Sequence, residues 1–339
     1  MKKIENLDSK LAIDEVFQNY SDVFSKTLHI YHKEWWGIKS ATLVLPGHKL
    51  EIPANSPVDI RIADKILATR GIRYVFFQGY SHNAADLAEH ISAFLGASVK
   101  MAVVTHVSVA QFDNQFEIDM LSLMMNQKKR GILKALFSVK PNFHTTCEAV
   151  EPLLLVNALP AWAVELPDVR TVDAAFIPLA RGLRKNLHAN HIALCRSSYS
   201  TVFSSQHGGD LLDIIDHKKV QYLGFIPPSH IRQIMGRVGL VLNVTLIECQ
   251  PMTFNEAVSV GTPCLTGPLF LPFMAKHPLR ELTEILEPDN VELIRVHAER
   301  IKQLWWHDHD GVVDMCRDYH EQVQRASAES YLLAVSRLD

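Results

Sequence analysis

A repeated alternation of short apolar runs and amphipathic segments constrains the fold of this chain more than any other feature. Apolar runs at residues 74–78, 100–105, 172–179 and 238–242 have the length of buried strands, and segments with helical periodicity follow them. Parallel strands are joined by helical crossovers and are buried on both faces, so their sequences are almost continuously apolar. The alternation therefore predicts an α/β protein with one parallel sheet in each half of the chain.

The remaining segments extend the same alternation. Further strands are predicted at 41–45, 132–139 and 220–223, and from 264 onwards. Helices are predicted at 8–36, 57–69, 83–95, 117–127, 185–195, 210–216, 229–236, 279–286, 291–306 and 313–338. The alternation breaks around Pro160 and Pro167. We therefore expect domains at 1–168 and 169–320, with a closing helical segment at 321–339.

The composition excludes several classes of protein. A net charge of -3 without a long Lys/Arg-rich run does not fit a nucleic-acid-binding protein. No apolar run approaches the ~20 residues of a membrane-spanning helix, and the polar residues 1–5 predict no signal peptide. Five scattered cysteines without a CxxC pair favour a reducing compartment and predict neither disulfides nor a zinc site. A cytoplasmic enzyme is the resulting expectation.

Two carboxylates flank a predicted loop-to-helix junction. Glu248 and Glu256 are separated by seven residues, and the helix is expected to begin near Thr253 or Phe254. A helix N-terminus attracts phosphate through its free N–H groups, and a first-turn carboxylate can accept the two vicinal hydroxyls of a ribose. The alternative is that Glu256 only complements the helix dipole and Glu248 is a solvated loop charge.

The stretch around these glutamates resembles a known family. Its parts are Tyr222–Ile226 (YLGFI), a short helix, the strand at 239–243, the Glu-x7-Glu spacing and the EAVSVGTPCL run of 256–265. Together they are similar to the C-terminal domain of the retaining Glu-x7-Glu group of GT-B-fold glycosyltransferases (glycosyltransferase group 1, family 4-like). The resemblance implies a GT-B architecture, with two Rossmann-like domains that each hold a parallel sheet and face each other across a cleft.

The resemblance also implies a function. An enzyme of this group transfers a sugar, of hexose type, from a nucleotide-sugar donor to a hydroxyl group with retention at the anomeric carbon. The N-terminal domain would lie on the acceptor side and the C-terminal domain would bind the nucleotide-sugar. We expect a glycan or another hydroxyl acceptor, a role in polysaccharide or glycoconjugate biosynthesis, and neither a metal nor another cofactor. Many such enzymes work at the inner face of a membrane, so peripheral membrane association is an alternative to a purely cytoplasmic location.

Site residues follow from the resemblance by position. Glu256 would bind the ribose hydroxyls, and Glu248 would face the transferred sugar near the reacting centre. Other donor-binding candidates are Gln250, Met252, Thr253, Gly224 and Phe225. Where the family has an aromatic-Gly pair after the first glutamate, this chain has Cys249-Gln250-Pro251, and a proline has no N–H group to donate. The identity of the donor sugar is therefore open.

A cationic turn follows the predicted strand at 172–179. Its sequence is Arg-Gly-Leu-Arg-Lys-Asn at 181–186, which combines a glycine with three cations at a strand-to-helix turn. Such a turn suits a diphosphate, and the matching loop of the family neutralises the departing nucleotide. We therefore expect Arg181 and Lys185 to take this catalytic role. The alternative is a solvated basic turn.

Histidines follow two strands of the N-terminal half. His106 comes directly after the strand at 100–105, and Gly79 and His82 come after the strand at 74–78. Ligands bind at the carboxyl ends of parallel strands. The resemblance implies a catalytic-site histidine beside the donor sugar, for which His106 is the first candidate. Gly79 and His82 are candidates for the acceptor side or the cleft. The alternative for His106 is a core or rim histidine.

Other patterns are weaker. His307-Asp308-His309-Asp310 contains Asp-x-Asp but lies between two predicted helices, and His188 and His191 lack an evident third ligand, so no metal is expected. The Trp35-Trp36 pair predicts packing at a domain edge or, alternatively, a membrane-facing or acceptor-facing aromatic pair. Two rival functions remain: a nucleotide-sugar epimerase of similar fold, and a non-catalytic glycosyltransferase-like binding subunit.

Overall fold

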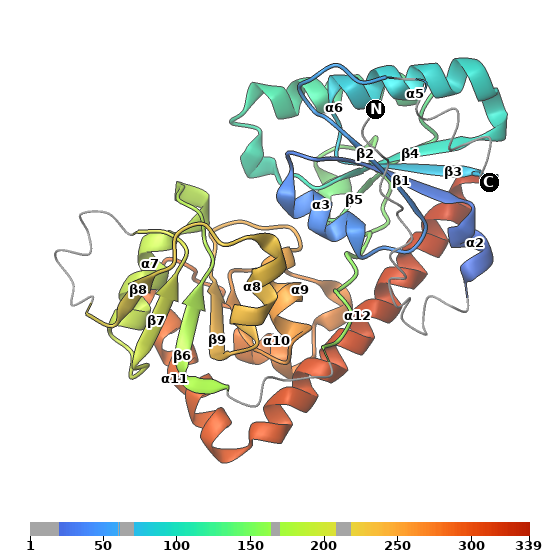
Figure 1. Cartoon of the computed structure of the whole chain (residues 1–339). Helices are drawn as coiled ribbons and strands as arrows, with labels where there is room; N and C mark the ends of the chain where they lie inside the picture. Colours follow the sequence, from blue (N-terminus) through green and yellow to red (C-terminus); the bar gives the residue numbers. More distant parts are fainter. Residues whose placement is uncertain (1–19, 60, 62–70, 164–169, 208–217) are drawn as a thin grey trace, which may run out of the picture.

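The computed structural model describes residues 20–59, 61, 71–163, 170–207 and 218–339, and it contains two five-stranded parallel sheets (Figure 1). The first sheet has the order β2-β1-β3-β4-β5 and contains β1 (Thr27–His32), β2 (His48–Ile52), β3 (Tyr74–Gln78), β4 (Lys100–Thr105) and β5 (Ala135–Ser138). The second has the order β10-β9-β6-β7-β8 and contains β6 (Thr171–Ile177), β7 (Thr201–Ser204), β8 (Val220–Tyr222), β9 (Val238–Asn243) and β10 (Cys264–Thr266).

Helices cover both sheets. Their bounds are α2 (Ser21–Ser25), α3 (Trp36–Leu43), α5 (His82–Leu95), α6 (Gln115–Lys129), α7 (Leu187–Cys195), α8 (Pro228–Met235), α9 (Met252–Val258), α10 (Pro278–Thr283), α11 (Val291–His307) and α12 (His309–Leu338). On β3, Val75 and Phe77 pack in the core that contains α5 and α6, whereas Phe76 packs in the core that contains the end of α12. This burial on both faces explains why the strand sequences are almost continuously apolar.

Helix α12 connects the two halves (Figure 1). Its first part carries Tyr319 and Val323 into the core under the second sheet. Its last part carries Tyr331 and Leu338 into the core under the first sheet. The Tyr74 hydroxyl donates to the Asp339 carboxylate at 2.9 Å. The closing helix therefore belongs to both halves. The strands of the first sheet lie within residues 27–138, and those of the second sheet lie within residues 171–266. The exact domain bounds of 1–168, 169–320 and 321–339 stay a prediction.

Several predicted elements are wrong. The helix predicted at 8–36 is interrupted by β1, and the strand predicted at 41–45 lies mostly in α3. Strand β1 was missed because His29 and His32 interrupt its apolar run, although both are fully buried. Strands β2 and β7 were also missed, since they are short and mix polar with apolar residues. Residues 8–19, most of the helix predicted at 57–69 and the helix predicted at 210–216 lie outside the described residues.

Candidate active site

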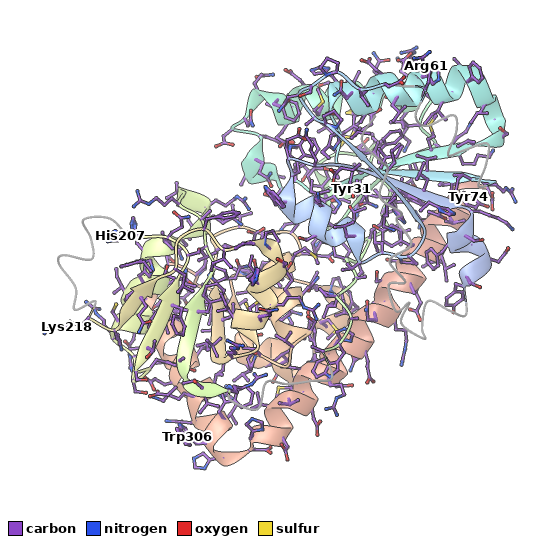
Figure 2. All side chains as sticks on the ribbon, viewed as in Figure 1. Tyr31, Arg61, Tyr74, His207, Lys218 and Trp306 are labelled. Carbon is purple, nitrogen blue, oxygen red and sulfur yellow. The ribbon has the colours of Figure 1, made fainter. Side chains whose placement is uncertain are left out.

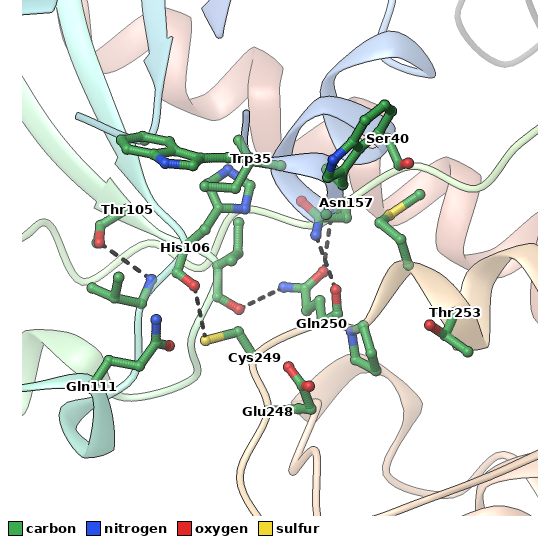
Figure 3. A pocket seen from close by; sticks show the side chains of 18 of the residues that line it. Trp35, Ser40, Thr105, His106, Gln111, Asn157, Glu248, Cys249, Gln250 and Thr253 are labelled. Carbon is green, nitrogen blue, oxygen red and sulfur yellow. Dashed lines mark hydrogen bonds between the residues drawn. The ribbon is translucent and has the colours of Figure 1, made fainter. Parts of the chain in front are cut away.

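A cavity of about 510 Å³ lies between the two halves, where loops at the carboxyl ends of both sheets meet (Figure 3). Parallel sheets bind ligands at this edge, because the loops that follow neighbouring strands converge there. The loops that contribute include those that follow β1, β3, β4, β5, β6 and β9. Of the predicted site residues, the cavity is lined by Gly79, His106, Lys185, Glu248, Gln250, Met252, Thr253 and Glu256. Eight of the twelve predicted site residues therefore line this cavity, and their roles stay predictions.

Glu248 lies among three cations. Its carboxylate accepts a hydrogen bond from Lys185 and is 3.3 Å from the Arg184 guanidinium. Its backbone carbonyl accepts a hydrogen bond from Lys140 at 2.6 Å. The Glu248 side chain is only 13% exposed, so water screens these ion pairs weakly. Of these cations, Arg184 and Lys185 line the cavity, and the positive charge that Glu248 leaves uncompensated suits a diphosphate.

Glu256 lies on α9, which begins at Met252, so the glutamate is on the second helical turn and not on the first as expected. Burial raises the pKa of the Glu256 carboxyl to about 7, although the charge of Arg232 and a hydrogen bond to the Ser40 side chain both lower the pKa. Glu256 is therefore partly protonated near neutral pH. Hydroxyl donors would favour its ionised form.

His106 is fixed by a buried polar network. Its Nε2 lies 2.9 Å from the Gln78 Oε1, and the Gln78 amide donates to the Tyr331 hydroxyl of α12 at 3.1 Å. Since the glutamine oxygen can only accept, His106 carries its proton on Nε2 and leaves Nδ1 as an acceptor. Burial lowers the pKa of His106 to about 4, so the ring is neutral at physiological pH. A neutral acceptor at this position suits a sugar hydroxyl.

Substitution of Gln78 tests this network. In Gln78→Glu, a carboxylate replaces the amide, so we expect the pKa of His106 to rise above about 6. In Gln78→Leu the ring should stay neutral. The titration of His106 can be followed by the nitrogen shifts of labelled histidine, with His106→Ala to assign the signal. Identical titration in the two variants would show that Gln78 does not set the protonation of His106.

The loop after Glu248 is tied to the first half of the chain. Gln250 Oε1 accepts the Asn157 N–H at 2.8 Å, and Gln250 Nε2 donates to the carbonyls of Val139 and Leu155. The Cys249 thiol contacts the His106 carbonyl at 3.5 Å (Figure 3). The polar atoms of the Gln250 side chain are thus occupied by backbone, although Gln250 was expected to bind the donor.

Four predicted residues do not line the cavity. Arg181 donates to the His207 carbonyl at 2.9 Å, away from the Glu248 cluster. His82 is the exposed first residue of α5. Gly224 and Phe225 lie in the loop after β8, and Phe225 is 84% exposed. None of the four residues belongs to the cavity wall, so the geometry of the cavity does not support their expected roles.

Arg184, Trp35 and Glu117 also line the cavity, although they were not among the residues predicted to bind or to catalyse. Arg184 lies beside Lys185 in the same predicted turn, where Arg181 was chosen. The Trp35 ring lies against Gly79 so closely that a Cβ there would meet the ring at 2.8 Å. This packing accounts for the glycine, and the Trp35 side chain also lines the cavity, as the acceptor-facing alternative requires. Glu117 of α6 is the third of these residues, and no motif marked it.

The described residues contain no group of three His, Cys, Asp or Glu side chains that could hold a metal ion. The Asp-x-Asp sequence lies at the turn between α11 and α12, beside the exposed Trp306 at the outer end of the second half (Figure 2). All five cysteines are free thiols. Among the described helices, none has both the length and the apolar character needed to cross a bilayer.

The structure resembles solved structures that share little of its sequence. Sucrose-phosphate synthase from Thermosynechococcus elongatus has a TM-score of 0.59 at 11% identity, over 92% of this chain and 99% of that chain. A TarM variant from S. aureus, in complex with fondaparinux, alpha-GlcNAc-glycerol and UDP, has a TM-score of 0.55 at 12% identity. That match covers 78% of this chain, which spans only 55% of the TarM chain.

A third structure bears on the rival function. UDP-GlcNAc 2-epimerase from Neisseria meningitidis, bound to UDP-GlcNAc, has a TM-score of 0.53 at 10% identity, over 92% of this chain and 99% of that chain. A scan against models of protein families finds no match, and a search of curated proteins finds none either. The structural likenesses, together with the two parallel sheets, confirm the predicted GT-B fold.

Proposed function

We propose that this protein is a retaining, metal-independent glycosyltransferase that moves a sugar, of hexose type, from a nucleotide-sugar to a hydroxyl acceptor. The observation that carries the proposal is the joint presence of Glu248, Glu256, Arg184 and Lys185 in one cavity between the two sheets. A nucleotide-sugar has the matching chemistry, with ribose hydroxyls for a carboxylate and a diphosphate for the cations. UDP is the nucleotide in the TarM complex and is our first choice of ligand.

The residues would divide the work of the reaction. Arg184 and Lys185 would neutralise the charge that develops on the departing diphosphate, which is the electrostatic stabilisation that the transition state needs. Glu256 would hold the ribose, and Glu248 would face the transferred sugar. His106 would accept a hydrogen bond from a sugar hydroxyl through Nδ1. The positive charges that a metal would otherwise supply are provided by the two side chains, so the proposal includes no metal and no other cofactor.

The two rival functions predict different experimental results. An epimerase would convert its nucleotide-sugar without an acceptor, and the structural likeness to UDP-GlcNAc 2-epimerase keeps this candidate in the test. A non-catalytic binding subunit would bind UDP without turnover, and the occupied loop at Gln250 favours this candidate. Incubation with UDP-sugars, with and without a mixture of glycan acceptors, separates the cases. Acceptor-dependent release of UDP supports the transferase, whereas acceptor-independent conversion supports the epimerase.

Substitution of Glu256 tests nucleotide binding through its pH dependence. With a pKa of about 7, the Glu256 carboxyl changes from mostly protonated to mostly ionised between about pH 6 and pH 8. Only the ionised form accepts both ribose hydroxyls, so wild-type affinity for UDP should rise about tenfold relative to Glu256→Gln over this range. Calorimetric titration with UDP at each pH measures the ratio of the wild-type affinity to the affinity of Glu256→Gln. Protonation of UDP itself affects both proteins equally and therefore cancels in this ratio. A ratio that does not change with pH would exclude Glu256 from the ribose site.

The same raised pKa affects stability without ligand. The unfolded chain loses the Glu256 proton near pH 4.5 and the folded chain near pH 7, so the folded state binds more protons between these values. Wild-type stability should therefore decrease as pH rises through this window, relative to Glu256→Gln. Denaturant unfolding at the two ends of the window measures the difference.

The location and the biological role are also proposals. We propose a cytoplasmic enzyme of polysaccharide or glycoconjugate biosynthesis, with a glycan as acceptor and no nucleic acid as partner. Peripheral association with the inner face of a membrane is the alternative location. Cell fractionation at low and high salt distinguishes the two, because electrostatic binding to a membrane surface is released by salt.

A further inference from the structure

The two walls of the cavity differ in charge. The wall from the second half carries the cations Arg184 and Lys185 beside Glu248. The wall from the first half is mainly apolar and includes Trp35, Met120, Leu121 and Met124. Among the described residues that line the cavity, Glu117 is the single acidic side chain from the first half, which contributes no Lys or Arg. A ligand that spans the cavity would therefore be anionic at one end and meet a carboxylate at the other.

The Glu117 carboxylate has no partner within the described part of the chain, neither a cation nor a hydrogen-bond donor. Glu117 lies in the first turn of α6, where the helix dipole favours a negative charge. Burial nevertheless raises the pKa of its carboxyl. A half-buried carboxylate without a partner is unfavourable for folding, and such groups are often retained for ligand binding.

A rigid aromatic surface accompanies this carboxylate. The Trp35 ring packs on the His32 ring with centroids 4.0 Å apart. The ring of Phe116, which precedes Glu117 in the chain, meets the Trp35 ring edge-on with centroids 6.3 Å apart. Gly79 lies against the same indole. Trp35 is therefore held in one orientation where it lines the cavity (Figure 3). An aromatic surface combined with a hydrogen-bond acceptor matches a sugar ring, which has apolar C–H faces and hydroxyl edges.

We propose that Glu117 is a specificity-determining residue, which accepts a hydrogen bond from a neutral sugar acceptor lying on Trp35 and excludes acceptors that carry a negative charge. This inference rests on the proposed function and adds the class of acceptor to it. A carboxylate on the acceptor would meet Glu117 without an intervening cation, because the cations of this cavity lie on the opposite wall. Repulsion of this kind lowers affinity by about a hundredfold or more.

Two matched ligands test the proposal: phenyl glucoside and phenyl glucuronide, which differ by one carboxylate. Their binding is measured by ligand-observed NMR in the presence of UDP, so that no turnover is needed. We expect the wild type to bind the glucoside and reject the glucuronide. In Glu117→Gln the glucoside should bind about tenfold more weakly and the glucuronide more tightly, because the charge is removed while the shape is kept. The affinity for UDP should not change.

The control is Asp119→Asn, which removes an exposed carboxylate of the same helix that pairs with Gln115 outside the cavity. It should bind both glycosides like the wild type. An unchanged ratio of glucoside to glucuronide affinity in Glu117→Gln would overturn the proposal, and so would a wild type that binds neither glycoside. Either result could occur while UDP binds normally. Normal UDP binding therefore distinguishes a failure of this inference from a failure of the proposed function.

Discussion

Replacement of Glu248 by glutamine is expected to strengthen the binding of UDP while it slows sugar transfer. In the ligand-free protein the Glu248 carboxylate is the counter-anion of Lys185 and Arg184, the two cations that the diphosphate needs. A neutral amide would leave both cations free, and the diphosphate would no longer compete with a fixed negative charge. We expect the Kd for UDP to fall about tenfold, which corresponds to ~1.4 kcal/mol.

Transfer should respond in the opposite direction. If Glu248 faces the sugar as proposed, its negative charge stabilises the positive charge that develops on the ring in the transition state. Loss of that charge is expected to lower the rate by about a hundredfold or more, as for other preorganised electrostatic groups. Tighter product binding and slower chemistry in one variant would separate Glu248 from Glu256, whose replacement weakens nucleotide binding.

Calorimetric titration with UDP and a UDP-release assay measure both quantities. Glu151→Gln is the matched control, because Glu151 pairs with Lys128 at 2.9 Å, is also mostly buried and lies outside the cavity. It should leave both quantities unchanged. Lys185→Gln should weaken UDP binding, which verifies that the cation faces the ligand. Weaker UDP binding in Glu248→Gln would contradict the expected competition between the Glu248 carboxylate and the diphosphate for these cations. The diphosphate would then bind elsewhere.

The elements that could be predicted are those whose sequence reflects burial on both faces. Strands β3 and β9 are almost continuously apolar, and their bounds match the predicted runs closely. Strand β1 could not be recognised, because its buried His29 interrupts the apolar pattern. The partners of His29 are Gln78, 49 residues away, and the ring of Tyr331 on α12. A single sequence does not show which distant residues will pack around a buried histidine.

The site was predictable to the extent that short-range motifs mark it. Glu248, Glu256 and His106 line the cavity, because strand ends and helix starts place them there. The choice between Arg181 and Arg184 depended on a single 3-10 turn at Leu183–Lys185, which directs Arg184 towards Glu248. Glu117 lies on a helix of the other half. Only the packing of the two halves brings it to the cavity.

The difference at Gln250 from the pattern of the family that the sequence resembles has a structural explanation. Where that family has an aromatic-Gly pair, this chain has residues whose side chains bind the first half of the chain. Gln250 is buried and binds the backbone of Val139, Leu155 and Asn157, which lie between the two sheets in sequence. The loop after Glu248 is thereby fixed against the connection between the halves. A change at Gln250 should therefore affect stability more than it affects the identity of the donor sugar.

Replacement of Gln250 by leucine is expected to be strongly destabilising. Leucine has a similar volume, but it leaves one N–H group and two carbonyls buried without partners, at ~1–3 kcal/mol each. We expect the free energy of unfolding to fall by ~3–5 kcal/mol, and urea denaturation measures it. The control is Gln322→Leu on the exposed face of α12, which should change stability by only about 0.5 kcal/mol. Equally small losses of unfolding free energy in the two variants would show that the hydrogen bonds of Gln250 do not join this loop to the first half. The difference at Gln250 from the pattern of the family that the sequence resembles would then need another cause.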